Sequence, residues 1–345
     1  MIGELILRAD ATTALGTGHV MRCLALAQAW QDAGGHAVFV IAAGSPALEN
    51  RLRAEGCEVL TLCTEPGSDD DAAHTATLAA QRRAAWLAVD GLHFGGNYQR
   101  ALKQSGLRVL AIDDGGTAGD YHADVVLNQN LSADERLYAR RQPTTRLLLG
   151  PAYALLRREF LSFAAIERRV PEVAEHVLVT LGGSDPHNMT LSVVRALQKS
   201  AGRPLEVVVV VGSANPHAPA IEDAAAASAD AMRVIRNAPN MPELMAWADL
   251  AISSGGTTVW ELAFMGVPSL VGLIAPIEEQ AAVGLESHRL FRVIGWFDRL
   301  PSDELAAIIA AYAEDRDARL EVSTRARQIV DGKGRQRTMD AMLHD

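Results

Sequence analysis

The 345-residue sequence contains no apolar run close to the roughly 20 residues that a bilayer-spanning helix needs. Its first residues, MIGELILRAD, lack the basic and long apolar regions of a secretion signal. Cysteine is scarce too, because Cys23, Cys57 and Cys63 form no Cys-x-x-Cys pair and lie near no His at zinc-ligand spacing. We therefore expect a cytoplasmic protein without membrane spans, disulfides or structural zinc.

Positive charge and aromatic side chains are also in short supply. The 32 Lys and Arg residues stand against 42 Asp and Glu residues, which gives a net charge of −10. This is the wrong sign for a protein that holds nucleic acid by neutralising its phosphates, and an aromatic content of 5% leaves few platforms for stacking bases. We therefore expect no nucleic-acid partner, and any phosphate must be bound by local backbone geometry. No feature of the sequence specifies an oligomeric state.

Short apolar runs alternate with longer stretches of helical spacing along most of the chain, which is typical of parallel α/β sheets. The length itself predicts two domains at about 150 residues each. Two series of strands are expected, at 5–9, 37–41, 59–62, 86–89, 109–112 and 125–127, and at 177–181, 205–211, 232–235, 250–253, 269–273 and 293–296. The pattern predicts an α/β protein of two doubly wound, Rossmann-like domains that face a cleft.

A charged segment between the two series, GPAYALLRREFLSFAAIERRVPEV, has a helical pattern that ends at Pro171. We place the domain boundary near residue 170, so that the domains cover 1–170 and 171–345. The tail at 302–345 is helical and polar, without a strand signal. It is expected either to pack back on the N-terminal domain or to form a pair of surface helices.

The first predicted strand runs into a turn, Asp10-Ala-Thr-Thr-Ala-Leu-Gly16-Thr-Gly18-His19, and then into a helix. A dinucleotide-binding fingerprint needs a third glycine where Met21 stands, so this turn does not indicate NAD. His19 lies in the first helical turn, where the helix dipole disfavours imidazolium and keeps the ring neutral, as a general base near pH 7 requires. A packing or capping role for His19 is the alternative.

Two glycine-rich turns follow strands of the second series. Gly182-Gly183-Ser184 exposes backbone N–H groups, although such turns are common between a strand and a helix. A more specific signal is ISSGGTTVWELAFMGVP at 252–268, where a helix begins directly after a strand that ends in small residues. The N–H groups of its first turn and two threonine hydroxyls suit a diphosphate, and Glu261 is placed to accept bonds from two ribose hydroxyls. The simpler alternative is a helix start capped by Thr257.

These motifs together resemble the UDP-2,4-diacetamido-2,4,6-trideoxy-β-L-altropyranose hydrolases of pseudaminic acid biosynthesis. The resemblance covers the chain to about residue 298 and rests on GTGHVMRCLALA, Asp90, Asp113-Asp114, GPAYALLRREF, LVTLGGSDPHN, NMPELMAWADLAISSGGTTVWELAFMGVPSL and Gln280. These enzymes are similar to inverting glycosyltransferases of the GT-B fold, including the lipid-II-forming N-acetylglucosaminyltransferase of peptidoglycan synthesis. They pass the sugar to water instead of to an acceptor.

The resemblance implies a role for each domain. His19 falls on the family's catalytic histidine in an N-terminal domain that holds the sugar, and the C-terminal domain holds UDP. The implied UDP-binding residues are Gly183, Ser184, Met241, Ser254, Gly255, Gly256, Thr257, Thr258 and Glu261. The implied sugar-binding residues are Asp10, Gly18, Asp90, Asp114, Glu279 and Gln280. Asp10, Asp90 and Asp114 follow predicted strands, so they are candidates for orienting His19 or holding sugar hydroxyls, with helix capping as the alternative. No cofactor and no metal are expected.

Two positions depart from the family pattern. Leu92 stands where the family usually has Tyr, and Glu279 stands where it usually has Asn. Both positions face the sugar in the family, so the resemblance supports hydrolysis of a UDP-sugar better than it supports one particular sugar.

The expected chemistry is simple because a nucleoside diphosphate is a good leaving group. One base for water and a positive field for the diphosphate are then enough, and direct attack by water inverts the anomeric carbon. Two alternatives stay open: a GT-B glycosyltransferase that uses an acceptor other than water, and a non-catalytic UDP-sugar-binding protein.

Overall fold

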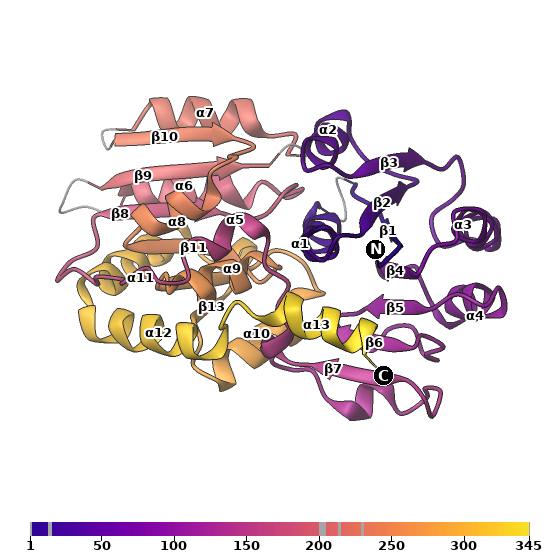
Figure 1. The fold of residues 1–345 in the computed structure, drawn as a ribbon. Helices are drawn as coiled ribbons and strands as arrows, with labels where there is room; N and C mark the ends of the chain where they lie inside the picture. Colours follow the sequence, from indigo (N-terminus) through magenta and orange to yellow (C-terminus); the bar gives the residue numbers. More distant parts are fainter. Residues whose placement is uncertain (1, 13–15, 200–204, 213–214, 229–230, 345) are drawn as a thin grey trace. The chain divides into compact units, whose positions relative to one another are not determined.

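Parallel β-sheets form the centres of two units in the structure, a computed structural model that describes residues 2–12, 16–199, 205–212, 215–228 and 231–344. Unit 1 comprises Met1–Arg158 and Gly332–Asp345, and unit 2 comprises Glu159–Asp331. Figure 1 labels their helices and strands. The division thus falls between Arg158 and Glu159, whereas the sequence analysis placed it near residue 170. The last helix of the chain belongs to unit 1.

Unit 1 has a seven-stranded sheet in the order β3-β2-β1-β4-β5-β6-β7, in which each pair of neighbouring strands is parallel. Its strands are β1 (Glu4–Ala9), β2 (His36–Ile41), β3 (Glu58–Thr61), β4 (Trp86–Asp90), β5 (Val109–Ile112), β6 (Val125–Asn128) and β7 (Arg146–Leu149). Its helices are α1 (Gly18–Asp32), α2 (Pro46–Ala54), α3 (Asp69–Gln81), α4 (Gly96–Gln104) and α13 (Gly334–Leu343), with short 3₁₀ turns η1 (Glu135–Tyr138) and η2 (Pro151–Tyr153).

Helices cover both faces of the unit 1 sheet, because strand side chains alternate between the faces. Leu5 and Leu7 of β1 pack into a core with α1, α2 and α13, whereas Ile6 between them packs with α3 and α4 on the opposite face. Met339 and Met342 carry α13 into the core beside α1. In Figure 1, α13 is the yellow helix that ends at the C-terminus.

Unit 2 has a six-stranded parallel sheet in the order β10-β9-β8-β11-β12-β13. Its strands are β8 (His176–Thr180), β9 (Glu206–Val211), β10 (Ala231–Arg236), β11 (Leu250–Ser254), β12 (Ser269–Leu273) and β13 (Arg292–Trp296). Its helices are α6 (Met189–Lys199), α7 (Ala218–Ala226), α8 (Met241–Trp247), α9 (Thr258–Met265), α10 (Glu278–Ser287), α11 (Ser302–Glu314) and α12 (Arg316–Ile329), with a 3₁₀ turn η3 (Phe297–Arg299). Valines of β8 and β9 form a core with α6, α7 and α11.

The prediction of two doubly wound α/β domains is confirmed, and all twelve expected strands are present. β7, a four-residue strand at one edge of the sheet, was missed. The helical pattern expected from residue 150 to Pro171 was wrong, since this segment contains only η2 and the four-residue α5 (Arg158–Leu161). Its apolar spacing reflects burial of an irregular segment: Leu155 packs in the unit 1 core and its N–H donates to the side chain of Gln129.

The order of the strands reverses at one place in each sheet, between β1 and β4 in unit 1 and between β8 and β11 in unit 2. We call these places the β1/β4 and β8/β11 switch points. The chain builds outward from the first strand of each pair and then crosses back to add the second. The loops at the carboxyl ends of such a pair separate in opposite directions, and open parallel sheets bind ligands in the space that this leaves. The turn that carries His19 follows β1, and the two glycine-rich turns of unit 2 follow β8 and β11.

Candidate functional site

His19 lies in the first turn of α1, which follows β1, and Asp90 is the last residue of β4. Because β1 and β4 are neighbours with Ala9 opposite Asp90, the carboxylate reaches the histidine. Asp90 Oδ1 is 2.7 Å from His19 Nδ1. Among the described residues, His19 Nε2 has no hydrogen-bond partner, and the side chain is 13% exposed.

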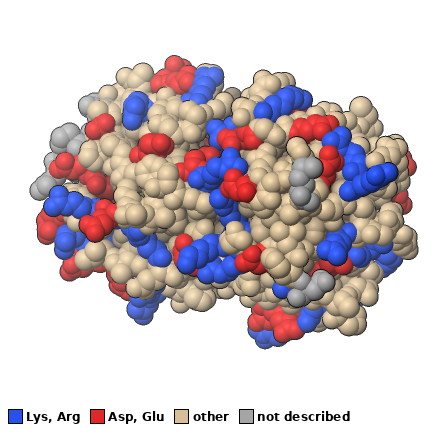
Figure 2. Space-filling model, in the orientation of Figure 1, with Lys and Arg blue, Asp and Glu red and all other residues tan. Residues whose placement is uncertain are grey.

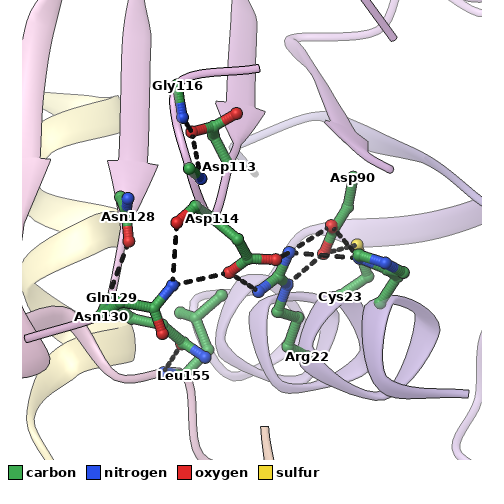
Figure 3. Close-up of polar contacts among 12 residues, drawn as sticks. Arg22, Cys23, Asp90, Asp113, Asp114, Gly116, Asn128, Gln129, Asn130 and Leu155 are labelled. Carbon is green, nitrogen blue, oxygen red and sulfur yellow. Dashed lines mark hydrogen bonds and ion pairs between the residues drawn. The ribbon is translucent and has the colours of Figure 1, made fainter. Parts of the chain in front are cut away.

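Arg22 holds this pair in place from the next turn of α1. Its guanidinium donates to both oxygens of Asp90 at 2.6 Å and to both oxygens of Asp114 at 2.7 and 2.8 Å. Figure 3 shows the guanidinium between the two carboxylates, with Asn130 on the far side of Asp114. Asn130 Nδ2 donates to Asp114 Oδ1 at 2.9 Å. Arg22 and Asp90 are buried, so this network fixes the carboxylate beside His19.

The charges of this network are stable at neutral pH. Burial alone would raise the pKa of Asp90, but Arg22 and then His19 outweigh it, so the pKa lies below its ordinary value. The pKa of Asp114 falls to about 2, because Arg22 outweighs the effect of burial. An ionised Asp90 can only accept, so it favours a proton on Nδ1 of His19. Arg22 NH2 also lies 3.2 Å from Nδ1, but it donates to Asp90 and Asp114 at shorter distances. In the tautomer with the proton on Nδ1, Nε2 keeps a lone pair. This is the tautomer that a general base needs at Nε2.

Asp10 belongs to a different group of contacts. It is 1% exposed, and its Oδ1 accepts the N–H groups of Ala42 and Ala43. Its Oδ2 contacts Arg8 NH1 at 2.7 Å and His93 Nε2 at 3.2 Å. The structure therefore pairs Asp10 with His93 and places Asp90, not Asp10, on His19.

In unit 2, the loops after β8 and β11 lie at adjacent strand ends, because Ser253 of β11 pairs with Thr180 of β8. The β11 loop leads directly into α9, with Gly255 buried and Gly256, Thr257 and Thr258 half-buried. Thr257 is the N-cap residue, but its hydroxyl makes no capping hydrogen bond. Within the described residues, the N–H groups of Gly256, Thr257 and Thr258 donate to no acceptor. These donors and hydroxyls are the parts of an anion site.

Glu278, at the start of α10 after β12, is a site residue that sequence reasoning missed. Its buried carboxylate accepts the N–H of Ile274 at 2.8 Å and hydrogen bonds from Ser254, Ala275 and Gly255. Burial raises its pKa despite these donors. Glu278 thus ties the β12 loop to the β11 loop and already uses the Gly255 N–H, so a ligand is left with the donors from Gly256 onward.

The remaining predicted residues lie around the same strand ends. Ser184 is buried after β8, and Gly183 packs against Gly212 closely enough that a Cβ on Gly212 would collide with it. Met241 begins α8 and is buried. Gly18 begins α1, and Glu261 lies half-buried on the first turn of α9. Glu279 and Gln280 are exposed at the start of α10.

Charged side chains of both signs are mixed on the face of the molecule drawn in Figure 2. In the part of the chain that the structure describes, no three His, Cys, Asp or Glu side chains form a group that could hold a metal ion. The described helices also include none that is both long and apolar enough to cross a bilayer.

Comparison with known proteins bears on both units. Residues 176–283 match the glycosyltransferase family 28 C-terminal domain. This stretch contains the β8 and β11 loops and the start of α10. The whole chain has the fold of MurG from Acinetobacter baumannii, with a TM-score of 0.66 and 16% identity over 99% of this chain and 100% of that one. The prediction of a GT-B fold is confirmed.

Relatives in sequence support the resemblance found from the motifs. The chain is 24% identical over 216 residues to the UDP-2,4-diacetamido-2,4,6-trideoxy-β-L-altropyranose hydrolase of Campylobacter jejuni, over 62% of this chain and 71% of that one. It is 28% identical over 216 residues to the spore coat polysaccharide biosynthesis protein SpsG of Bacillus subtilis, over 62% of each chain. It is 24% identical over 268 residues to an uncharacterized protein of Methanocaldococcus jannaschii, over 76% of this chain. These last two alignments span 62% and 54% of the relatives' own lengths.

Proposed function

We propose that this protein is a nucleotide-sugar hydrolase that releases UDP from a UDP-linked 2,4-diacetamido-2,4,6-trideoxyhexose, as a step of nonulosonic (pseudaminic) acid biosynthesis. The observation that carries the proposal is the His19–Asp90 pair, with Nδ1 held at 2.7 Å by the carboxylate and Nε2 left without a partner among the described residues. The resemblance to the Campylobacter jejuni hydrolase supports the choice of substrate.

Water is the nucleophile in this proposal. His19 Nε2 takes a proton from water as the water oxygen bonds to the anomeric carbon, while the bond from that carbon to the diphosphate oxygen breaks and UDP leaves with the electron pair. Asp90 stabilises the imidazolium that forms, and Arg22 keeps Asp90 ionised. A single displacement of this kind inverts the anomeric carbon.

Unit 2 supplies the site for UDP. The free N–H groups at the start of α9 and the helix dipole stabilise negative charge on the departing diphosphate, and Glu261 accepts hydrogen bonds from the ribose. We propose that these donors act without a metal ion. We also propose that the reaction takes place in the cytoplasm, because Cys23, Cys57 and Cys63 are free thiols and disulfides are rare in that compartment.

The second candidate is a glycosyltransferase that passes the same sugar to an acceptor other than water. It is favoured by the match of residues 176–283 to a glycosyltransferase domain. In our proposal this stretch holds the nucleotide, and it does not contain His19 or the network around it. We therefore place the choice of acceptor in unit 1.

The test is to incubate the purified protein with UDP-sugars, with and without acceptor alcohols, and to measure free UDP. A hydrolase releases UDP without an acceptor, a glycosyltransferase needs one, and a binding protein releases none. For a hydrolase, an NMR time course catches the first-formed anomer of the product. We expect inversion, and a retained anomer would contradict a single displacement by water.

A further inference from the structure

A second histidine–carboxylate pair lies at the β1/β4 switch point beside the first. His93 Nε2 is 3.2 Å from Asp10 Oδ2. The two pairs exchange partners across the neighbouring strands: His19 follows β1 and contacts Asp90 of β4, whereas His93 follows β4 and contacts Asp10, which follows β1. Because adjacent strands lie only about 4.8 Å apart, the two imidazoles belong to the same edge of the sheet.

The contacts of Asp10 determine which nitrogen of His93 is available. Asp10 is ionised, because the His93 hydrogen bond and Arg8 lower its pKa against the effect of burial. Its carboxylate therefore accepts the Nε2–H of His93, and in this tautomer the ring has its lone pair on Nδ1. In the described part of the chain Nδ1 forms no hydrogen bond, and the side chain is 22% exposed. His93 thus has an acceptor atom without a partner among the described residues, on a half-buried ring whose orientation is fixed by its contact with the buried Asp10.

The local sequence is built to hold the ring in this position. Gly91 lies directly beneath it, since a Cβ at residue 91 would come within 2.9 Å of His93 Cε1 and 3.3 Å of Nδ1. Phe94 also packs against the ring, with ring centroids 4.1 Å apart. Leu92, between Gly91 and His93, is 43% exposed.

We propose that Nδ1 of His93 accepts a hydrogen bond from an N–H or O–H group of the sugar, which makes His93 a specificity-determining residue beside the base His19. This inference rests on the proposed function in one respect, that unit 1 receives the sugar. An acylamino group offers an N–H donor of the required kind. A sugar without a donor at that place leaves Nδ1 unpaired, and the loss of one such bond corresponds to about five- to tenfold in affinity.

The alternative is that His93 has only a structural role and shields the buried Arg8–Asp10 pair from solvent. Two variants separate the roles. His93→Gln keeps a side-chain N–H where Nε2 stands, so it can still donate to Asp10, but it has no acceptor at Nδ1. His93→Asn places a polar atom near Nδ1 and loses the contact with Asp10. Tyr98→Phe is the matched control, because the Tyr98 hydroxyl contacts Asp71, the second partner of Arg8, from the buried side.

The measurement is calorimetry in a His19→Asn background, which is expected to consume the substrate about 10²- to 10⁴-fold more slowly than the unaltered protein. The ligands are UDP-2,4-diacetamido-2,4,6-trideoxy-β-L-altropyranose and UDP. The readout is the gain from the sugar, which is the Kd of UDP divided by the Kd of the UDP-sugar. We expect His93→Gln to reduce this gain about five- to tenfold and to leave the Kd of UDP unchanged. We expect Tyr98→Phe to keep the gain, and His93→Asn to keep more of it than His93→Gln while unfolding at lower temperature.

The inference is overturned if the sugar adds nothing to affinity in the background protein, if His93→Gln keeps the gain, if His93→Gln fails to fold, or if Tyr98→Phe reduces the gain equally. Failure of the proposed function is a separate result. A protein that binds the sugar through His93 but releases no UDP refutes hydrolysis and leaves this inference standing.

Discussion

The switch points of the two units have the same topology but opposite chemistry. At β1/β4 of unit 1, the side chains that converge are charged or titratable: His19, Arg22, Asp90 and Asp114. At β8/β11 of unit 2, the loops consist mainly of glycine, serine and threonine, and the carboxylate of Glu278 is turned onto backbone N–H groups. One switch point is organised by side chains, the other by the backbone.

The difference follows from what each site has to do. Proton transfer requires a titratable group in a defined tautomer, and only a buried ion-pair network holds a histidine in that way. A diphosphate has a fixed charge and needs donors at short range, which the start of a helix provides without positive side chains. A chain with a net charge of −10 can therefore hold an anion.

The largest stability effect is expected at the centre of the unit 1 network. Arg22→Met leaves two carboxylates without their partner, and breaking a buried ion pair in this way costs about 3–5 kcal/mol of unfolding free energy. Arg82→Met is the control, because Arg82 pairs with Glu4 and Glu58 near the surface and such pairs contribute about 0–1 kcal/mol. Urea titration of both variants measures the difference. Equal losses would show that the network does not depend on Arg22.

The backbone site of unit 2 is tested by adding a charge to it. Gly256→Asp is expected to weaken UDP binding about 10³-fold, since two like charges about 4 Å apart repel by about 4 kcal/mol near a protein surface. The fold should survive, because a Cβ at residue 256 meets only Glu278 Oε1 and Ser254 Oγ, both at 3.7 Å. Gly256→Asn has the same size without the charge and is expected to bind UDP far better. If calorimetry gives both variants the affinity of the unaltered protein, the diphosphate binds elsewhere.

A smaller effect is expected in the pH dependence of stability. The pKa of Asp114 is lowered to about 2 from an ordinary value of 3.8, so its ion pair with Arg22 stabilises the fold above pH 4 and is lost as the pH falls toward 2. This amounts to roughly 2 kcal/mol. Asp114→Asn removes that dependence, so its unfolding free energy should fall less than that of the parent between pH 6 and pH 2. Parallel pH profiles for the two proteins would contradict the assignment.

No effect is expected from removing divalent cations. The start of α9 offers backbone donors where a metal-dependent enzyme would place a metal ion. UDP release should therefore be the same after EDTA treatment as before it. Loss of turnover that Mg²⁺ or Mn²⁺ restores would show that the backbone donors are not sufficient.

Much of this architecture could be predicted because its causes are local. Apolar runs of three to seven residues placed twelve strands. Gly266, with φ of +65°, ends α9. Asp90 could be named as one of three candidate partners of His19, with Asp10 and Asp114, because the carboxyl ends of neighbouring parallel strands share one edge. The helix predicted around Leu155 was wrong, because the apolar residues there are buried from an irregular segment and not from one face of a helix.

The residues that were missed depend on long-range pairing. Arg22 reaches Asp90 and Asp114, which lie 68 and 92 positions away. Its spacing of three residues from His19 placed it on the same helical face, and that was the available signal. Asp10 was grouped with Asp90 because both follow strands, but backbone N–H groups and His93 occupy its oxygens. Glu278 gave no signal, since its partners are the Ser254 side chain and backbone N–H groups of the β11 and β12 loops.

The account is tested most directly by measuring turnover and UDP affinity on the same His19→Asn protein. Asparagine keeps polarity at this position but cannot act as the base, so UDP release should fall about 10²- to 10⁴-fold, the range for a positioned proton transfer. The Kd of UDP should stay unchanged, because its donors belong to α9 of unit 2. Unchanged turnover would show that His19 is not the base. A loss of UDP affinity as large as the loss of turnover would contradict the assignment of proton transfer to the β1/β4 switch point and of UDP binding to the β8/β11 switch point.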